Sequence, residues 1–178
     1  MRVVAGSLGG RRLHAPPGRA TRPTADRVRE ALFSILGDVS GLSVLDLFAG
    51  SGALGIEALS RGAAGATFVD SSARAVAAVK RNLSELGLEA PVIRRDALVF
   101  LAGPGRAAGA PYDLVFLDPP YSSADRLAGP LSERLPSIAS GKALIVSESD
   151  KRNPLELTLP LEGERTYGDT RIALHRVQ

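Results

Sequence analysis

Apolar and polar positions alternate in blocks along most of this chain, from Leu42 onward. Short apolar runs that end in a polar residue predict buried strands, and such runs occupy residues 43–47, 66–69, 92–94, 112–117 and 143–147. Between them lie stretches with helical caps or spacing, at residues 53–61, from a cap at Ser71 or Ser72 to near Gly87, at 97–101 and at 126–135. A strand, a helix and two loops repeat at the length of a βαβ unit. The pattern therefore predicts an α/β fold with a mostly parallel sheet.

The C-terminal part of the chain follows a different pattern. Residues 155–159 and 172–177 alternate between apolar and polar as strands do, and Gly168-Asp169 between them is a turn candidate. We expect these two segments to form a closing antiparallel pair. The stretch 103–110 is rich in glycine and alanine and is typical of a loop.

The N-terminal part differs again. Residues 2–5 and 11–14 flank a glycine-rich stretch, which predicts a β-hairpin. An extended segment at 19–24 then leads into a helix, whose packed face carries Val28, Leu32, Ile35 and Leu36. We expect residues 1–38 to form an extension over the site and residues 39–178 to form the main domain.

Composition narrows the class of protein. The chain has 178 residues, enough to bury a core, with an ordinary hydrophobic share of 44%. It contains no cysteine, which excludes disulfides and thiol catalysis. No apolar run reaches the length of a membrane span, and the N-terminus does not read as a signal peptide. His14 and His175 lie far apart, so no metal site is expected. We expect a cytoplasmic monomer without a membrane partner.

Charge is concentrated at the N-terminal end. The net charge is only +3, yet residues 1–29 hold seven arginines and a single acid, Asp26, so the rest of the chain is slightly acidic. A basic extension on an acidic body is typical of contact with phosphates. The candidate phosphate contacts, which would touch RNA if the substrate is a nucleic acid, are therefore Arg2, Arg11, Arg12, Arg19, Arg22, Arg27 and Arg29. Of these, Arg27 and Arg29 lie off the packed face of the predicted helix.

Four acids recur where the predicted strands end. Asp46, Asp70, Asp96 and Asp118 follow successive apolar runs at intervals of 22 to 26 residues. Ligands of open α/β sheets bind at the carboxyl ends of the strands. A single aspartate after a strand is often a helix cap, but the repetition predicts a rim lined by carboxylates.

A glycine loop joins the first predicted strand to its helix. Residues 50–55 read G-x-G-x-x-G, and Asp70 lies 20 residues beyond Gly50, as in dinucleotide-binding proteins. A nicotinamide dinucleotide would place its pyrophosphate at the helix N-terminus. S-Adenosylmethionine has no phosphate but offers a sulfonium, an ammonium and a ribose. Asp46 would repel a pyrophosphate and suits an ammonium, and Asp96 could accept from an adenine amino group, so the acids favour S-adenosylmethionine.

The segment Asp118-Pro119-Pro120-Tyr121 follows the apolar run 112–117. Each proline lacks an N–H, and the residue before a proline is pushed into an extended conformation, so this corner is stiff. It presents a carboxylate and backbone carbonyls as acceptors, with an aromatic ring beside them. Such a set suits a planar group that carries an NH2, such as the edge of a nucleobase.

Taken together, the glycine loop, the strand-end acids and residues 118–121 resemble the motifs of class I amino-group methyltransferases. Residues 22–33 are more specific, and resemble the RsmD type of 16S ribosomal RNA guanine-N2 methyltransferases. In one departure, the hairpin carries Leu8 and Gly9 where that family often has a bulky aromatic and a basic residue.

The resemblance implies a Rossmann-like, mostly parallel seven-stranded sheet whose last strand is antiparallel. It also implies S-adenosylmethionine as cofactor and 16S ribosomal RNA or a small-subunit assembly particle as substrate, methylated on N2 of guanine 966. The implied catalytic residues are Asp118, Pro119, Pro120 and Tyr121. The implied cofactor contacts are Asp46, Phe48, Ala49, Gly50, Ser51, Gly52, Gly55, Asp70, Ser71, Asp96 and Ala97.

Three alternatives remain open from the residues. The 118–121 segment also serves enzymes of this fold that act on DNA adenine N6 or on protein glutamine. The glycine loop also suits a nicotinamide-dependent oxidoreductase. A non-catalytic RNA-binding module would explain the arginines alone.

Overall fold

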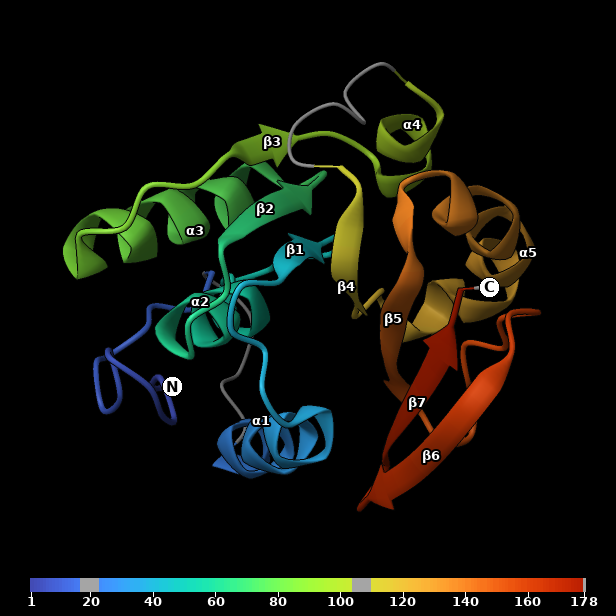
Figure 1. Ribbon diagram of the computed structural model, residues 1–178, viewed down its shortest axis with the longest axis horizontal. Helices are drawn as coiled ribbons and strands as arrows, with labels where there is room; N and C mark the ends of the chain where they lie inside the picture. Colours follow the sequence, from blue (N-terminus) through green and yellow to red (C-terminus); the bar gives the residue numbers. More distant parts are fainter. Residues whose placement is uncertain (17–22, 104–109, 178) are drawn as a thin grey trace.

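The computed structural model describes residues 1–16, 23–103 and 110–177 (Figure 1). Its helices are α1 Pro23–Leu36, α2 Ala53–Ser60, α3 Ala73–Leu86, α4 Ala97–Ala102 and α5 Ala124–Arg134, with 3₁₀ turns η2 Tyr121–Ser123 and η3 Leu135–Ser137. Its strands are β1 Ser43–Asp46, β2 Gly65–Asp70, β3 Val92–Arg94, β4 Tyr112–Leu117, β5 Ala139–Asp150, β6 Leu161–Tyr167 and β7 Thr170–Arg176. Within the described residues, no helix is both long and apolar enough to cross a membrane.

The seven strands form one sheet in the order β3-β2-β1-β4-β5-β7-β6. Strands β1 to β5 pair in parallel, whereas β7 runs antiparallel to both of its neighbours. The predicted seven-stranded, mostly parallel sheet is therefore confirmed. The strand order reverses between β1 and β4, and such a switch point is where open α/β sheets bind their ligands.

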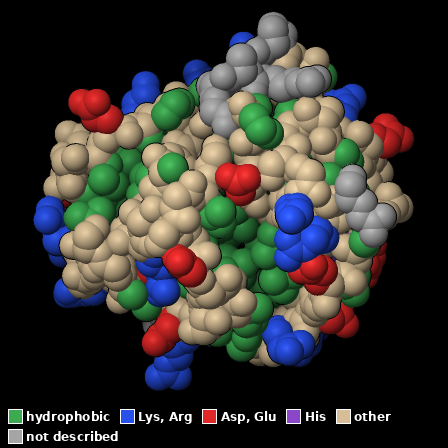
Figure 2. All heavy atoms as spheres, in the orientation of Figure 1, with side chains coloured by type: hydrophobic (Ala, Val, Ile, Leu, Met, Phe, Trp, Pro, Cys, Tyr) green, Lys and Arg blue, Asp and Glu red, His purple; other side chains and the backbone are tan. Residues whose placement is uncertain are grey.

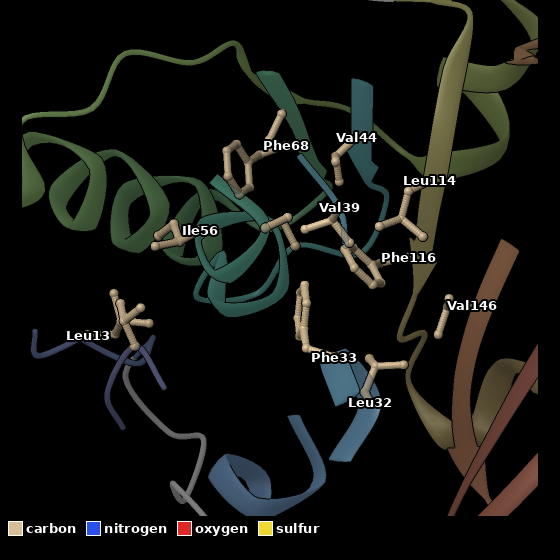
Figure 3. Close-up of a cluster of buried hydrophobic side chains, with 14 of the residues drawn as sticks. Leu13, Leu32, Phe33, Val39, Val44, Ile56, Phe68, Leu114, Phe116 and Val146 are labelled. Atoms are coloured by element: carbon tan, nitrogen blue, oxygen red, sulfur yellow. The ribbon is translucent and has the colours of Figure 1, made fainter. Parts of the chain in front are cut away.

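Helices cover both faces of the sheet (Figure 1). The core on one face joins α1, α2 and α3 to the strands, and the core on the other joins α4 and α5 to them. Figure 3 shows Phe33 of α1 approaching Phe116 of β4, with ring centroids 5.8 Å apart. Because the inner strands are buried on both faces, they read as continuous apolar runs, which is why the sequence located them well.

One strand prediction is wrong. Residues 155–159 do not form a strand, and the turn at residues 168–169 instead joins β7 to β6 at residues 161–167. The alternation at 155–159 arises because Leu155 and Leu157 are buried in the core beside α5, without any strand ladder. Strand β6 is an almost fully exposed edge strand, so it shows no apolar face in the sequence.

The extended segment predicted at 19–24 is partly wrong as well. Helix α1 already begins at Pro23, and proline is favoured at the first helical position because it needs no N–H partner there. The remainder of that segment, with Arg19 and Arg22, lies outside the described residues, as does most of the loop predicted at 103–110.

The predicted N-terminal hairpin is confirmed. The Val3 N–H donates to the Arg11 carbonyl at 2.9 Å, and the Leu13 N–H donates to the Met1 carbonyl at 3.0 Å. Both Val3 and Leu13 are almost fully buried, and Leu13 belongs to the core that Figure 3 shows. The hairpin is thus part of the packed structure rather than a free arm.

Candidate active site

The strand-end acids meet at one rim of the sheet, as predicted. Asp46 and Asp70 are the last residues of β1 and β2, and Asp118 directly follows β4. Asp96 follows β3 and caps α4, where its Oδ1 accepts from the N–H groups of Leu98 and Val99. Each of these strands is parallel to the next, so their carboxyl ends lie at the same edge of the sheet.

Asp46 is the buried member of this group. Its side chain is only 2% exposed, and its Oδ2 accepts the Gly55 N–H at 3.0 Å. Burial raises the pKa of Asp46 to about 7, with the nearby charges of Asp118 and Asp70 adding to the rise and the Gly55 N–H opposing it. One oxygen of this carboxylate is thus used by the start of α2, and the expected contact of Asp46 with an ammonium group stays a prediction.

The N–H groups of the glycine loop already donate to carboxylates and to the loop's own backbone. The Gly50 N–H donates to Asp70 Oδ2 at 2.9 Å, and the Gly52 N–H donates to the Ala49 carbonyl at 2.6 Å. Both Gly50 and Gly52 have positive φ, which a residue with a side chain adopts only with strain. Together with Gly55, three glycine N–H groups that could face a phosphate already have partners.

The third glycine serves packing between helix and sheet. A Cβ at Gly55 would lie 2.4 Å from Cε1 of Phe68, whose ring is fully buried in β2. Gly55 therefore allows α2 to approach the sheet closely, which is the role of the third glycine in such fingerprints. Gly55 thus packs against Phe68 and donates its N–H to Asp46, and its contact with a cofactor stays a prediction.

The other residues predicted to contact the cofactor surround the same loop. Ala49 and Ser51 are buried in the loop, Phe48 is half-buried, and the Ala49 N–H donates to the Val69 carbonyl at 3.0 Å. Ser71 is exposed, and Ser72, rather than Ser71, caps α3 by accepting from the Ala75 N–H. Ala97 is buried as the first residue of α4.

The corner after β4 lies beside this loop. Asp118 is half-buried, Pro119 is buried and Pro120 is exposed. The Pro120 carbonyl accepts the Ser123 N–H at 2.9 Å, so it closes the 3₁₀ turn that begins at Tyr121 and is not a free acceptor as expected. In the described residues no hydrogen bond reaches the Pro119 carbonyl. The Pro119 carbonyl is therefore an acceptor that the described residues leave open, and it lies directly after the half-buried Asp118 carboxylate.

The donor set of the site fits S-adenosylmethionine and does not fit a dinucleotide. A pyrophosphate is bound by N–H donors, yet this loop has given three N–H groups to internal partners, and Asp46 lies within electrostatic reach of both Asp118 and Asp70. A sulfonium with an ammonium and ribose hydroxyls requires acceptors, and these carboxylates supply them.

The predicted RNA-contact arginines take different positions. Arg12 and Arg27 are exposed, and their side chains form no hydrogen bond or ion pair with any other described residue. Arg2 and Arg11 are exposed too, but each donates to a backbone carbonyl, of Gly10 and of Glu85 respectively.

The prediction that Arg29 is a surface residue is wrong. Its side chain is 4% exposed and pairs with Asp26 at 2.9 Å and with Glu57 at 3.5 Å. It also donates to the Arg2 carbonyl. Arg29 is excluded from contact with solvent because the hairpin and α2 pack against α1, and spacing along one helix cannot show this.

Three exposed arginines outside the basic N-terminal segment lie at the rim itself. Arg94 ends β3 next to Asp70 of β2, Arg95 follows it, and Arg74 lies in the first turn of α3. No carboxylate pairs with these three side chains within the described ranges. The pair of arginines directly before a strand-end acid was the available signal. Figure 2 shows Lys and Arg side chains spread around the visible face rather than gathered in one patch.

Comparison with known proteins agrees with this geometry. Residues 1–176 match the family described as conserved hypothetical protein 95. The chain is 37% identical to ribosomal RNA small subunit methyltransferase D of Escherichia coli strain K12, with 99% of this chain and 89% of that protein covered. It superposes on a hypothetical protein of Thermus thermophilus with a TM-score of 0.83 at 32% identity, covering 99% of each chain.

A more distant structure shares the fold alone. It is the Thermus thermophilus 16S rRNA N2 G1207 methyltransferase RsmC in complex with AdoMet and guanosine, with a TM-score of 0.73 at 21% identity over 97% of this chain and 46% of that one. Both the family match and the close relative span nearly all of this sequence. The chain therefore belongs to the conserved hypothetical protein 95 family, the RsmD family of methyltransferases.

Proposed function

We propose that this chain transfers a methyl group from S-adenosylmethionine to the exocyclic N2 amino group of a guanine in small-subunit ribosomal RNA, at guanine 966. The observation that carries the proposal is the proximity of the Asp118 corner to the glycine loop: β1 and β4 pair in parallel, with Asp46 opposite Phe116, and the Leu47 N–H donates to the Phe116 carbonyl at 3.1 Å. Acceptors for an NH2 group thus lie beside a rim of carboxylates suited to a cationic methyl donor.

Residues at the rim would hold the cofactor. Asp70 ends β2 and suits ribose hydroxyls, while Asp96 lies at the end of β3 and suits the adenine amino group. Gly50 and Gly52 allow the loop backbone to approach the cofactor closely, and Asp46 holds the loop in place by accepting the Gly55 N–H. The bound cofactor supplies an electrophilic methyl group, and the acids around it stabilise its positive charge.

The corner after β4 would position the guanine. The N2 amine is a weak nucleophile because its lone pair is delocalised into the ring. Asp118 and the Pro119 carbonyl accept its two hydrogens, which directs the lone pair away from the corner. The base leaves its own stack to enter the site, and the stacking partner predicted from the sequence is Tyr121, whose side chain lies outside the described part of the structure. Most of the acceleration comes from this positioning. The amine becomes acidic as it is methylated, so its proton passes to solvent without a strong general base.

RNA affinity would come from exposed arginines around the site. Arg12 of the hairpin and Arg27 of α1 are available for phosphate contacts, and Arg74, Arg94 and Arg95 are available at the rim. Binding through phosphates weakens as salt rises, because condensed counterions are released.

The test is methyl transfer from labelled S-adenosylmethionine to small-subunit particles that lack the modification, followed by mapping of the methylated base. The wild-type protein should label one guanine, at N2. Asp118→Ala should abolish transfer while it still binds S-adenosylhomocysteine, and Asp125→Ala, an exposed acid in the first turn of α5, should remain active. An Asp118→Ala variant that transfers methyl groups at the wild-type rate contradicts the mechanism.

The same assay separates the alternatives. Labelling of DNA adenine or of a protein glutamine in place of RNA would move the enzyme to another substrate of the same fold. Binding of NAD but not of S-adenosylhomocysteine would indicate an oxidoreductase. Parallel reactions with free 16S rRNA and with assembled particles decide which form is the substrate.

A further inference from the structure

One buried amide connects the N-terminal hairpin to the glycine loop. Asn82 of α3 is 1% exposed, and its Oδ1 accepts the His14 N–H at 2.8 Å. Its Nδ2 donates to the His14 carbonyl at 3.0 Å and to the Ser51 carbonyl at 2.8 Å. The amide thus uses both donors and its acceptor on two segments that are distant in sequence, and no other side chain of this size offers that combination.

The two connected segments belong to different parts of the proposed site. Ser51 lies between Gly50 and Gly52 in the loop that would hold the cofactor, and both glycines have positive φ. His14 follows closely after Arg11 and Arg12 in the second arm of the hairpin. A displacement of the loop would therefore strain or release the end of the hairpin, and the reverse also holds.

The hairpin is fastened a second time, to the helix that begins at the same loop. Glu57 of α2 is fully buried and accepts the N–H groups of Val4 at 2.7 Å and Ala5 at 3.0 Å. Ser60, also on α2, accepts the Leu8 N–H at 3.0 Å and donates to the Ala5 carbonyl. With the hairpin anchored on α2 and on Asn82, the loop between these anchors has few independent movements.

We propose that Asn82 is a positioning residue that couples cofactor binding to RNA binding. The inference rests on the proposed function, because it assigns the cofactor to the glycine loop and RNA phosphates to the hairpin. A cofactor that restricts the motion of the loop also fixes the position of the Ser51 carbonyl. Through the hydrogen bonds of Asn82 it then restricts the motion of the hairpin, which carries Arg11 and Arg12. Coupling between two sites is reciprocal, so RNA should strengthen cofactor binding by the same factor. Couplings of this kind amount to about 5- to 150-fold in affinity.

The experiment measures four dissociation constants. Binding of S-adenosylhomocysteine is titrated with and without 16S rRNA, and binding of 16S rRNA is titrated with and without S-adenosylhomocysteine. Wild-type protein should show equal coupling factors in both directions, within about 5- to 150-fold. Asn82→Asp keeps the acceptor for the His14 N–H but loses both donors, and its coupling factor should fall to about 1.

A matched control separates coupling from a loss of packing. Ser132 on α5 is 6% exposed; its Oγ donates to the Ala128 carbonyl and accepts the Thr158 N–H, on the other face of the sheet. Ser132→Ala should lose stability yet keep the wild-type coupling factor. If Asn82→Asp keeps the wild-type factor, or if the wild-type factor itself is 1, the inference is overturned.

A second measurement needs no variant. Hydrogen exchange at the N–H groups of Leu13 and His14 in the wild-type protein should slow when S-adenosylhomocysteine binds, and unchanged rates would overturn the inference. Failure of the proposed function has a different signature, since a wild-type protein that binds no S-adenosylhomocysteine refutes both. An active enzyme with uncoupled sites refutes only the role of Asn82.

Discussion

The attachment of the hairpin to α2 depends on the absence of one side chain. Gly6 has φ +83°, and a Cβ placed on it would lie 1.9 Å from the Ser60 carbonyl oxygen and 2.4 Å from the carbonyl carbon. These are backbone atoms of a helix and cannot rotate away. Gly10 has almost the same backbone angle, φ +82°, but nothing lies within 4 Å of its Cβ position. The pair Gly6→Ala and Gly10→Ala therefore separates backbone strain from the clash.

The expected magnitudes follow from these contacts. A left-handed conformation costs an alanine about 1–2 kcal/mol, and this cost applies at both positions. Gly6→Ala must in addition move the hairpin away from Ser60. It then loses the bonds from the Ser7 N–H at 2.8 Å, from the Leu8 N–H at 3.0 Å and to the Ala5 carbonyl at 2.6 Å. At about 1 kcal/mol each, these bonds add about 3 kcal/mol.

Urea unfolding measures the sum of the conformational cost and the lost hydrogen bonds. Trypsin cleavage after Arg11 and Arg12 measures local release of the hairpin. Gly10→Ala should lower the free energy of unfolding by about 1–2 kcal/mol, and Gly6→Ala by about 4–5 kcal/mol. Where the hairpin detaches alone, Gly6→Ala should be cleaved faster in native buffer than Gly10→Ala. Equal stability and equal cleavage rates of the two variants would refute the reasoning.

Three further predictions concern the rim. Gly55→Ala should lower the free energy of unfolding by about 1–3 kcal/mol, because its Cβ clashes with Phe68. Gly65→Ala has open space around its Cβ and should change the free energy of unfolding by less than about 0.5 kcal/mol. Urea titrations in which Gly65→Ala is the less stable variant would contradict this prediction. Because the raised pKa of Asp46 means that the folded state holds its proton more tightly, stability should fall as the pH rises from about 4 to about 7 and level off above, and Asp46→Asn should remove that slope. An Asp46→Asn protein with the wild-type slope would show that another group titrates. Arg95→Gln should weaken RNA binding and reduce its salt slope by about 1 without changing the affinity for S-adenosylhomocysteine, and an unaltered slope would remove the rim from the RNA interface.

Much of the fold was predictable because its signals are local. Parallel strands that are buried on both faces are continuous apolar runs, and the predicted bounds of 92–94 and 112–117 match β3 and β4. Helix ends were visible as caps, and Ser72 and Gly87 do lie at the two cap positions of α3. The edge strand β6 was missed because an exposed strand is defined by its ladder to β7, and a ladder leaves no apolar pattern in the strand itself.

The candidate site, too, has features that follow from sequence spacing and features that depend on tertiary packing. Sequence spacing determined that Asp46, Asp70, Asp96 and Asp118 end successive strands, and parallel pairing then places them at one rim. Only the tertiary structure decided that Asp46 and Asp70 bind the loop N–H groups, which disfavours a phosphate-bearing cofactor there. That pairing depends on how α2 packs against the sheet.

The N-terminal segment shows most clearly how far local sequence patterns can predict structure. Its composition determined a basic hairpin and an amphipathic helix, because charge and apolar spacing are properties of neighbouring residues. The burial of Arg29, the anchoring of the hairpin on Glu57 and its link to the loop through Asn82 were decided by contacts between residues up to 68 positions apart in the chain. No local pattern encodes such partners, since they meet only when the sheet has brought α1, α2 and α3 onto one face.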